Sequence, residues 1–212
     1  MKIYPMKVFT WENSSGITAA DIPESTEVIN FRRFDQPISP NVLPESLKHI
    51  DFGQRFDMPI EPNVLPNSLE SITFGTAFNQ PIGQNVPHDS LEYIIFKRQF
   101  NQPIDPGVLP NSLNSITFGP DFNQPIYIGS LPKHLQSITF DHKFNQPIGA
   151  NVLHNSLKSI GFGHGFNQQI YPGVLPNSLK TIAFGNRFNQ QSTYRPMCSS
   201  RFSKIYCIRM AI

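Results

Sequence analysis

The chain has 212 residues, of which 39% are hydrophobic and 15% are charged. Twenty prolines and thirteen glycines exclude a protein built from long helices, because a proline inside a helix costs about 3 kcal/mol. The formal charge of +2 is unevenly distributed: residues 1–141 carry nine basic and fifteen acidic side chains, whereas residues 142–212 carry eight basic side chains and no acidic one. Such polarity can steer a charged partner, and drift at exposed positions also produces it.

The sequence shows no targeting signal and no membrane segment. The N-terminus lacks the apolar core of a signal peptide, and no stretch approaches the roughly 18 apolar residues of a membrane span. The two cysteines, Cys198 and Cys207, lie close together near the C-terminus, whereas a secreted disulfide scaffold uses more cysteines and spreads them out. We therefore expect a monomeric cytoplasmic protein without a membrane span.

Residues 1–21 form an N-terminal segment that is expected to cap the array that follows. The sequence Val8-Phe9-Thr10-Trp11 favours a covering strand, and residues 13–16 favour a turn. Residues 22–31 are an incomplete first copy of a repeat, with Thr26 at a position that later copies fill with leucine. A cap is expected because the end of a repeat array exposes a cross-section of its core.

A repeat of 22 residues determines the architecture. Two columns of phenylalanine, one of leucine and one of isoleucine recur at this step. The first phenylalanine column is Phe34, Phe56, Phe78, Phe100, Phe122, Phe144, Phe166 and Phe188, and the second is Phe52, Phe74, Phe96, Phe118, Phe140, Phe162 and Phe184. Residues 34–187 are seven uninterrupted units, and edge units extend the repeat region to residues 22–191.

Each unit predicts one short strand and one turning return segment. The pattern is L-P-N-S-L-x-x-I-x-F-G-x-x-F-N-Q-P-I, as in residues 65–82, in which Ile-x-Phe favours a strand and Pro-Asn-Ser and Gly favour turns. Strands at one fixed step stack in parallel, about 4.8 Å apart. A single unit buries too little apolar surface to offset its ordering, so the coils must stabilise one another. We expect a β-rich solenoid with 22 residues per coil and little or no helix.

The recurring Phe-Asn-x-Pro-Ile, as in residues 78–82, resembles the FNIP repeat family of social amoebae and giant DNA viruses. That repeat is similar in turn to leucine-rich repeats, whose L-x-x-L-x-L-x-x-N resembles Leu69-x-x-Ile72-x-Phe74 and the following Asn79. The resemblance covers residues 22–191 and implies a leucine-rich-repeat-like right-handed coil with a parallel sheet on its concave side. It also implies an internal structural ladder of asparagines that hydrogen-bonds the turning backbone, one from each unit: Asn79, Asn101, Asn123, Asn145 and Asn167.

Many members of that family carry an F-box ahead of the repeats and would act as ubiquitin-ligase adaptors. Only about twenty residues precede the first unit here, too few for this helical module. An adaptor remnant that lacks its F-box is therefore an alternative to the main interpretation. The resemblance implies an unknown host or viral protein as partner and, if the protein is viral, the host cytoplasm as its location.

The segment 192–212 departs from the repeat and is rich in basic residues. It holds four basic side chains, no acidic one and both cysteines. Three interpretations stay open: an improvised cap that uses Phe202, Ile205, Ile208 and Ile212, a basic arm that meets a partner or a membrane surface, or the out-of-frame end of a longer array.

One coil breaks the uniformity of the predicted concave face. Its outward positions hold mostly serine, threonine and glycine, but Tyr93, Ile95 and Lys97 replace them together in one unit, followed by Arg98. Because solenoids bind partners through residues that interrupt such a uniform surface, we expect these four residues to form the partner site. Neutral divergence of one unit is the alternative.

No motif predicts catalysis or a cofactor. His142 and His164 share a column and could begin a zinc site, but Asn186 occupies the next position of that column, and we expect solvated histidines and no metal. Glu70 and Glu92 share a column that also holds lysine and amides, which is typical of a solvated strand position rather than of paired catalytic carboxylates. Phosphate-binding, nucleophile-elbow and metalloprotease motifs are absent from the sequence, and the basic stripe is too thin to predict nucleic-acid binding.

The sequence therefore predicts a non-catalytic, intracellular solenoid for protein–protein interaction. The alternative is a passive or truncated repeat array without a specific ligand.

Overall fold

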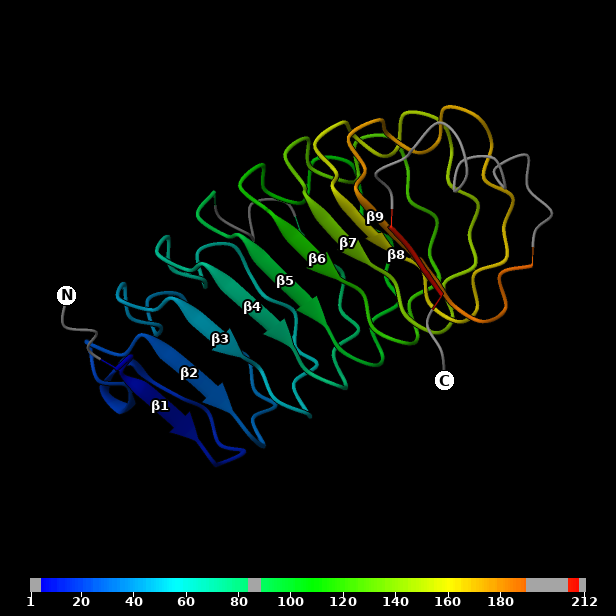
Figure 1. The fold of residues 1–212 in the computed structure, drawn as a ribbon. Helices are drawn as coiled ribbons and strands as arrows, with labels where there is room; N and C mark the ends of the chain where they lie inside the picture. The colour runs from blue at the N-terminus through cyan, green and yellow to red at the C-terminus, as the bar shows by residue number, and fades with distance from the viewer. Residues whose placement is uncertain (1–4, 84–88, 190–205, 210–212) are drawn as a thin grey trace.

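The computed structural model describes residues 5–83, 89–189 and the backbone of 206–209. Its strands are β1 (Val8–Trp11), β2 (Val28–Phe31), β3 (His49–Asp51), β4 (Ser71–Phe74), β5 (Tyr93–Phe96), β6 (Ser115–Thr117), β7 (Ser137–Thr139), β8 (Ser159–Gly161), β9 (Thr181–Phe184) and β10 (Tyr206–Arg209). One turn of 3-10 helix, η1 (Ala19–Asp21), lies between β1 and β2. The strands form one sheet in chain order (Figure 1).

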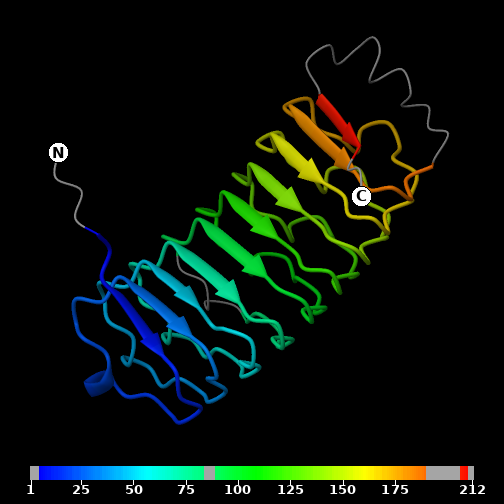
Figure 2. The same cartoon turned by 60° about the horizontal axis from the view of Figure 1, so that its bottom comes forward.

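Every neighbouring pair of strands is parallel, and the register follows the repeat. Ile50 pairs with Ile72, and Ile72 with Ile94, so equivalent positions of successive units lie side by side. The chain rises by one strand per coil, with the sheet along one side and the return segments along the other (Figures 1 and 2). The expected leucine-rich-repeat-like β-solenoid with almost no helix is confirmed.

The core is a double stack of phenylalanine rings that runs along the solenoid. Within a coil the two rings lie close together, for example Phe118 and Phe122 with centroids 4.0 Å apart. Between coils each ring stacks on its equivalent, with Phe118 5.7 Å from Phe96 and 5.5 Å from Phe140. The rings of both columns are buried between Phe52 and Phe166, beside equally buried isoleucines and leucines. The alternation of buried and outward residues along each strand produces this packing.

A recurring serine, three residues after the leucine of the Leu-Pro pair in most units, ties its coil to the preceding one. Its hydroxyl donates a hydrogen bond to a leucine carbonyl oxygen there, as Ser68 does to Leu47 at 2.7 Å and Ser112 to Leu91 at 2.7 Å. Ser90, Ser156 and Ser178 form equivalent bonds. These serines recur because they satisfy buried backbone carbonyls, which explains why they need no catalytic role.

One corner of each coil requires a left-handed backbone. The residues at this corner have φ between 63° and 87°, and they are Asn41, Asn63, Gly107, Gly129, Asn151 and Gly173. Only glycine and, less readily, asparagine adopt this conformation at low cost. For that reason the described positions of this column hold either asparagine or glycine. This constraint was not predicted from the sequence.

The N-terminal segment contributes the predicted strand. β1 pairs in parallel with β2, and Trp11 Nε1 donates to the Ser15 carbonyl at 3.3 Å, within the predicted turn. Farther along, the side chain and backbone of Thr18 donate to the Asp21 carboxylate at 2.7 and 2.8 Å, which holds the pKa of Asp21 below its ordinary value. Residues 5–21 therefore continue the sheet by one strand and then turn into the first coil.

The C-terminal segment adds a strand as well. β10 pairs in parallel with β9, with Tyr206 opposite Thr181, three residues beyond the usual step. Part of the segment that the sequence analysis set apart from the repeat thus extends its sheet. Phe202 and Ile212, named there for the capping alternative, lie outside the described residues, as does Ile205. Of Ile208 the structure describes the backbone, opposite Ala183.

We expect His154→Pro to raise the free energy of unfolding by about 1 kcal/mol. His154 occupies a position that holds proline in Pro44, Pro66, Pro110, Pro132 and Pro176, and its Nε2 is buried without a hydrogen-bond partner among the described residues. Its carbonyl accepts from Leu157, as the carbonyl of Pro66 does from Leu69, so the backbone already suits proline. Urea unfolding measures the change. His154→Ala serves as a control that removes the ring without stiffening the chain, and a destabilised proline variant would contradict the argument.

Candidate functional site

The outward side chains of strands β2–β9 form a surface that we call the open sheet face. Its first column is Val28, His49, Ser71, Tyr93, Ser115, Ser137, Ser159 and Thr181, and its second is Asn30, Asp51, Thr73, Ile95, Thr117, Thr139, Gly161 and Ala183. Most of these residues are half-buried because each packs beside its neighbours in the next strands. On strands β6–β9 the outward side chains are small: serines and threonines, with one glycine and one alanine.

Strand β5 stands out from this surface. Of the eight strands β2–β9, whose side chains are all described, it is the one in which both outward residues are exposed, with Tyr93 at 47% and Ile95 at 40%. Tyr93 lies between Ser71 and Ser115, and Ile95 lies between Thr73 and Thr117. An aromatic and a branched aliphatic side chain thus project from a floor of small hydroxyl-bearing residues.

Lys97 follows directly after β5 and reaches across the open sheet face. Its Nζ lies 3.1 Å from Asp51 Oδ2, on a strand two positions away, and the two side chains are about equally exposed. An exposed ion pair of this kind contributes at most about 1 kcal/mol to stability. Its larger effect is geometric, because it holds the lysine stem across β4, beside the exposed Ile95. This pair has no signature in the sequence, since Lys97 and Asp51 occupy different columns and different units.

Arg98 is exposed and forms no ion pair with any residue that the structure describes. It is the second residue after the end of β5, and its carbonyl accepts a hydrogen bond from Asp121 in the next coil. The four predicted partner-site residues therefore lie within one short segment, 93–98. Two of them are exposed apolar groups, one is a paired cation and one is an unpaired cation.

A polar ladder borders the open sheet face. From Glu92 to Lys158, the residue before the strand hydrogen-bonds to its equivalent in the next coil: Asn114 Nδ2 lies 3.2 Å from Glu92, Gln136 Nε2 3.3 Å from Asn114, and Lys158 Nζ 2.6 Å from Gln136. In the same column Lys48 forms an ion pair with Glu70 at 2.9 Å. Both glutamates are thus engaged in cross-coil contacts. This arrangement stabilises the stack and provides no pair of free carboxylates for catalysis.

The asparagines of the predicted ladder occupy the opposite end of each strand segment. The side-chain oxygen of each accepts a hydrogen bond from the backbone N–H of its equivalent in the following coil, at 2.8 Å for Asn79 to Asn101 and for Asn101 to Asn123. The bonds continue from Asn123 to Asn145 and from Asn145 to Asn167, both at 2.9 Å. The expectation that this ladder is internal is wrong: the asparagines are half-buried or exposed, so the ladder lies at the surface. It holds adjacent coils in register.

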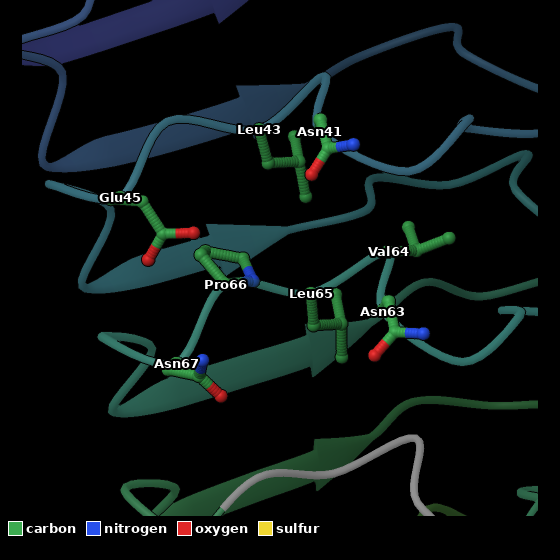
Figure 3. Close-up of a pocket in the computed structure, with 8 residues that line it drawn as sticks. All are labelled: Asn41, Leu43, Glu45, Asn63, Val64, Leu65, Pro66 and Asn67. Carbon is green, nitrogen blue, oxygen red and sulfur yellow. The ribbon is translucent and has the colours of Figure 1, made fainter.

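Two shallow grooves lie on the return side near the N-terminal end. The smaller, of about 290 Å³, is lined by polar Asn41, Glu45, Asn63 and Asn67 and by apolar Leu43, Val64, Leu65 and Pro66. Figure 3 shows Asn41 and Leu43 on one coil, and Asn63 and Leu65 at the same positions of the next coil. A neighbouring groove of about 420 Å³ shares Asn41, Leu43 and Glu45. The larger groove also includes Ser46, whose hydroxyl donates to the backbone carbonyls of Glu24 and Thr26, so this serine has the same structural role as its equivalents in later coils.

The histidines of the sequence analysis lie in the turns after β7 and β8. Their ring centroids are 4.7 Å apart. Within the part of the chain that the structure describes, no three side chains of the metal-ligating types converge on one point. None of the described helices has the length and apolar character of a membrane span.

Comparison with known proteins identifies the repeat. The model of the FNIP repeat matches residues 13–55, 56–99, 100–143 and 144–191. A solved structure described as "The crystal structure of CroV588 a novel circular LRR protein structure", from a giant virus, superposes with a TM-score of 0.76 and 50% sequence identity. The match covers 80% of this chain and 25% of that one, so the chain spans about a quarter of the length of that protein. No curated protein sequence matches significantly. Solenoids of this type are typically scaffolds for protein interaction, and this chain belongs to the FNIP repeat family.

Proposed function

We propose that the chain is a non-catalytic solenoid that binds a protein partner on its open sheet face, centred on Tyr93, Ile95, Lys97 and Arg98. The observation that carries this proposal is the exposure of Tyr93 and Ile95 above a floor of serine and threonine. Aromatic side chains with apolar and cationic neighbours are the residues that most often dominate the binding energy of an interface. The neighbouring strands contribute a flat surface on which a partner can pack around this centre.

The charges support a specific kind of contact. Lys97, which directly follows β5, pairs with Asp51 of β3, toward the N-terminal coils. Arg98 is the next residue and forms no ion pair with any described residue. A partner surface with an apolar projection and an adjacent carboxylate would match Tyr93 and Ile95 on one hand and Arg98 on the other. Burial of the two apolar side chains supplies the affinity in this arrangement, and the arginine supplies orientation.

We expect a variant with Tyr93→Ser, Ile95→Thr and Lys97→Gly to capture at least about tenfold less partner from host-cell lysate than the native chain does. Each replacement is the residue found at the same position of the preceding coil, namely Ser71, Thr73 and Gly75, so the fold accommodates it. Quantitative mass spectrometry of proteins retained by the native and variant chains measures the effect.

The matched control is Tyr127→Ser with Ile128→Ala. These two residues are exposed to 58% and 65% and lie on a return segment away from the open sheet face. A partner that is lost from the β5 variant and retained by the control supports the site. Equal loss from both variants indicates non-specific apolar adhesion, and retention of every partner by the β5 variant contradicts the proposal. If both native and variant chains retain only chaperones, the passive array becomes the better interpretation.

A further inference from the structure

The sequence alone favoured solvated histidines without a metal at positions 142 and 164, but the geometry of the two turns points to a different interpretation. We propose that His142 and His164 form a two-histidine site for a divalent transition metal such as Zn²⁺, with Asp141 orienting His142. The two histidines occupy the same position of successive coils, in the turns that follow β7 and β8. The site is of a different class from a closed structural zinc centre, because the protein supplies two ligands and leaves the remaining positions to water or to a group from another molecule.

The separation of the rings suits bidentate coordination. Their centroids are 4.7 Å apart and their planes are inclined by 52°. Since a zinc–nitrogen bond is about 2.1 Å long, a bound ion lies about 3.2 Å from the centroid of each imidazole, and two rings at a tetrahedral ion have centroids about 5 Å apart. Small rotations of the two side chains therefore suffice to place one nitrogen of each ring on a common ion. The His142 side chain is 63% exposed, which leaves room for the ion and its waters.

Asp141 fixes the chemistry of His142. Its Oδ1 lies 2.7 Å from Nδ1 of the His142 ring. An imidazole that donates its Nδ1–H to a carboxylate carries its lone pair on Nε2, where a metal can bind. Carboxylate partners of this kind are the usual second layer around metal-bound histidines, because they set the tautomer and make the ring a stronger ligand.

The backbone holds the two turns against each other. Gly165 N–H donates to the His142 carbonyl at 2.7 Å. Gly163 and Gly165 flank His164, and a Cβ at either would overlap a carbonyl oxygen of the preceding coil, that of Asp141 or that of His142. At these two positions a Cβ would push the turns apart, so the glycines allow His164 to lie close beside His142. A rigid backbone under both ligands lowers the entropy lost on binding.

The two charged residues that flank His142, Asp141 and Lys143, leave a carboxylate beside its ring. Lys143, the nearest basic side chain in sequence, forms an ion pair with Asp121 at 2.7 Å and is thereby neutralised. The carboxylate of Asp141 adds negative charge directly beside His142. A metal bound at this position would also link the fifth and sixth complete units of the array across their turns.

The test is a titration of the full chain with ZnCl₂, followed by isothermal calorimetry and by imidazole ¹⁵N chemical shifts. We expect one zinc ion to bind per chain and to shift a ring nitrogen of both His142 and His164. His142→Asn and His164→Asn should each weaken binding at least about tenfold, because a chelate becomes a single ligand. Asn186 occupies the same position of the next coil, so the fold accommodates asparagine there. His49→Ser is the matched control and should leave the affinity unchanged.

The role of Asp141 has a separate readout. Asp141→Gly should weaken zinc binding about 10-fold to 100-fold, whereas Asp141→Asn, whose amide oxygen still accepts from Nδ1, should recover part of the affinity. All titrations are repeated with Cys198→Ser and Cys207→Ser, so that binding by the thiols is distinguished from binding by the histidines. Unchanged affinity in His164→Asn, or full binding after both histidines are replaced, would overturn the proposal. Equal unfolding midpoints of the metal-free variants establish that each is folded.

Discussion

Phe118→Ala is expected to lower the free energy of unfolding by about 3–5 kcal/mol, the usual cost of truncating a buried phenylalanine. Phe118 is fully buried and lies at the middle of the double stack. Its ring contacts Phe122 in its own coil and stacks between Phe96 and Phe140 of the adjacent coils. Removal of the ring opens a cavity between three coils, and rigid stacking prevents the neighbours from closing it. Urea unfolding followed by circular dichroism measures the loss.

Phe188→Ala is the matched comparison for this prediction. Phe188 is half-buried, and its described ring contacts are with Phe166 and Phe184. We expect it to cost less than half as much, because in a repeat array each coil is stabilised by the neighbours on both of its sides. Equal losses from the two variants would show that the array does not depend on coil-to-coil stacking in the way that the structure indicates.

Gly119→Ala is the second large effect that we expect, with a loss of at least about 2 kcal/mol. A Cβ at Gly119 would overlap the carbonyl oxygen of Lys97, which belongs to the backbone of the preceding coil. A backbone atom has no alternative rotamer, so the coils must separate at this point. The same overlap recurs at Gly75, Gly163 and Gly185, which explains the glycine after the strand in most units.

Gly149→Ala separates this steric effect from the general effect of replacing glycine. The nearest atom to a Cβ at Gly149 is the Val152 Cγ2 at 3.7 Å, an ordinary van der Waals contact. We expect a change within about 0.5 kcal/mol or a small stabilisation, since alanine restricts the unfolded chain. A loss at Gly149 as large as the loss at Gly119 would contradict the explanation by close backbone approach.

Much of the fold follows from the sequence because every coil carries the same residue pattern and therefore adopts the same conformation. Ile94 and Phe96 were expected to point inward and Tyr93 and Ile95 outward, and their burial shows this arrangement. A fixed step of 22 residues leaves one register for a parallel sheet, because identical residues must stack on one another. The residues that recur in each column therefore indicate directly which side chains stack on one another.

The features that were missed depend on backbone conformation and on contacts between different columns. The left-handed corner alternates between asparagine and glycine, so no single residue type marks it in the sequence. Lys97 reaches Asp51 across an intervening strand, and the amides and lysines before the strands join into a ladder only when the coils are stacked. The β10 strand was missed because it carries none of the repeat consensus.

The candidate site was located by departure from consensus, a signal that indicates where the surface changes but not which partner it contacts. The structure adds the exposure of Tyr93 and Ile95 and the pairing of Lys97. It also shows that other large apolar side chains, Tyr127, Ile128 and Tyr171, are exposed on the return segments. A direct experiment must therefore distinguish these two surfaces.

Hydroxyl-radical footprinting of the chain, free and bound to its captured partner, makes this distinction at the level of single side chains. In the free chain Tyr93, Tyr127 and Tyr171 should all be labelled, since about half of each side chain is exposed. If the open sheet face is the interaction surface, binding will reduce the labelling of Tyr93 and Ile95 and leave that of Tyr127 and Tyr171 unchanged. Protection of Tyr127 and Tyr171 with continued labelling of Tyr93 would contradict that assignment and place the interaction surface on the return side.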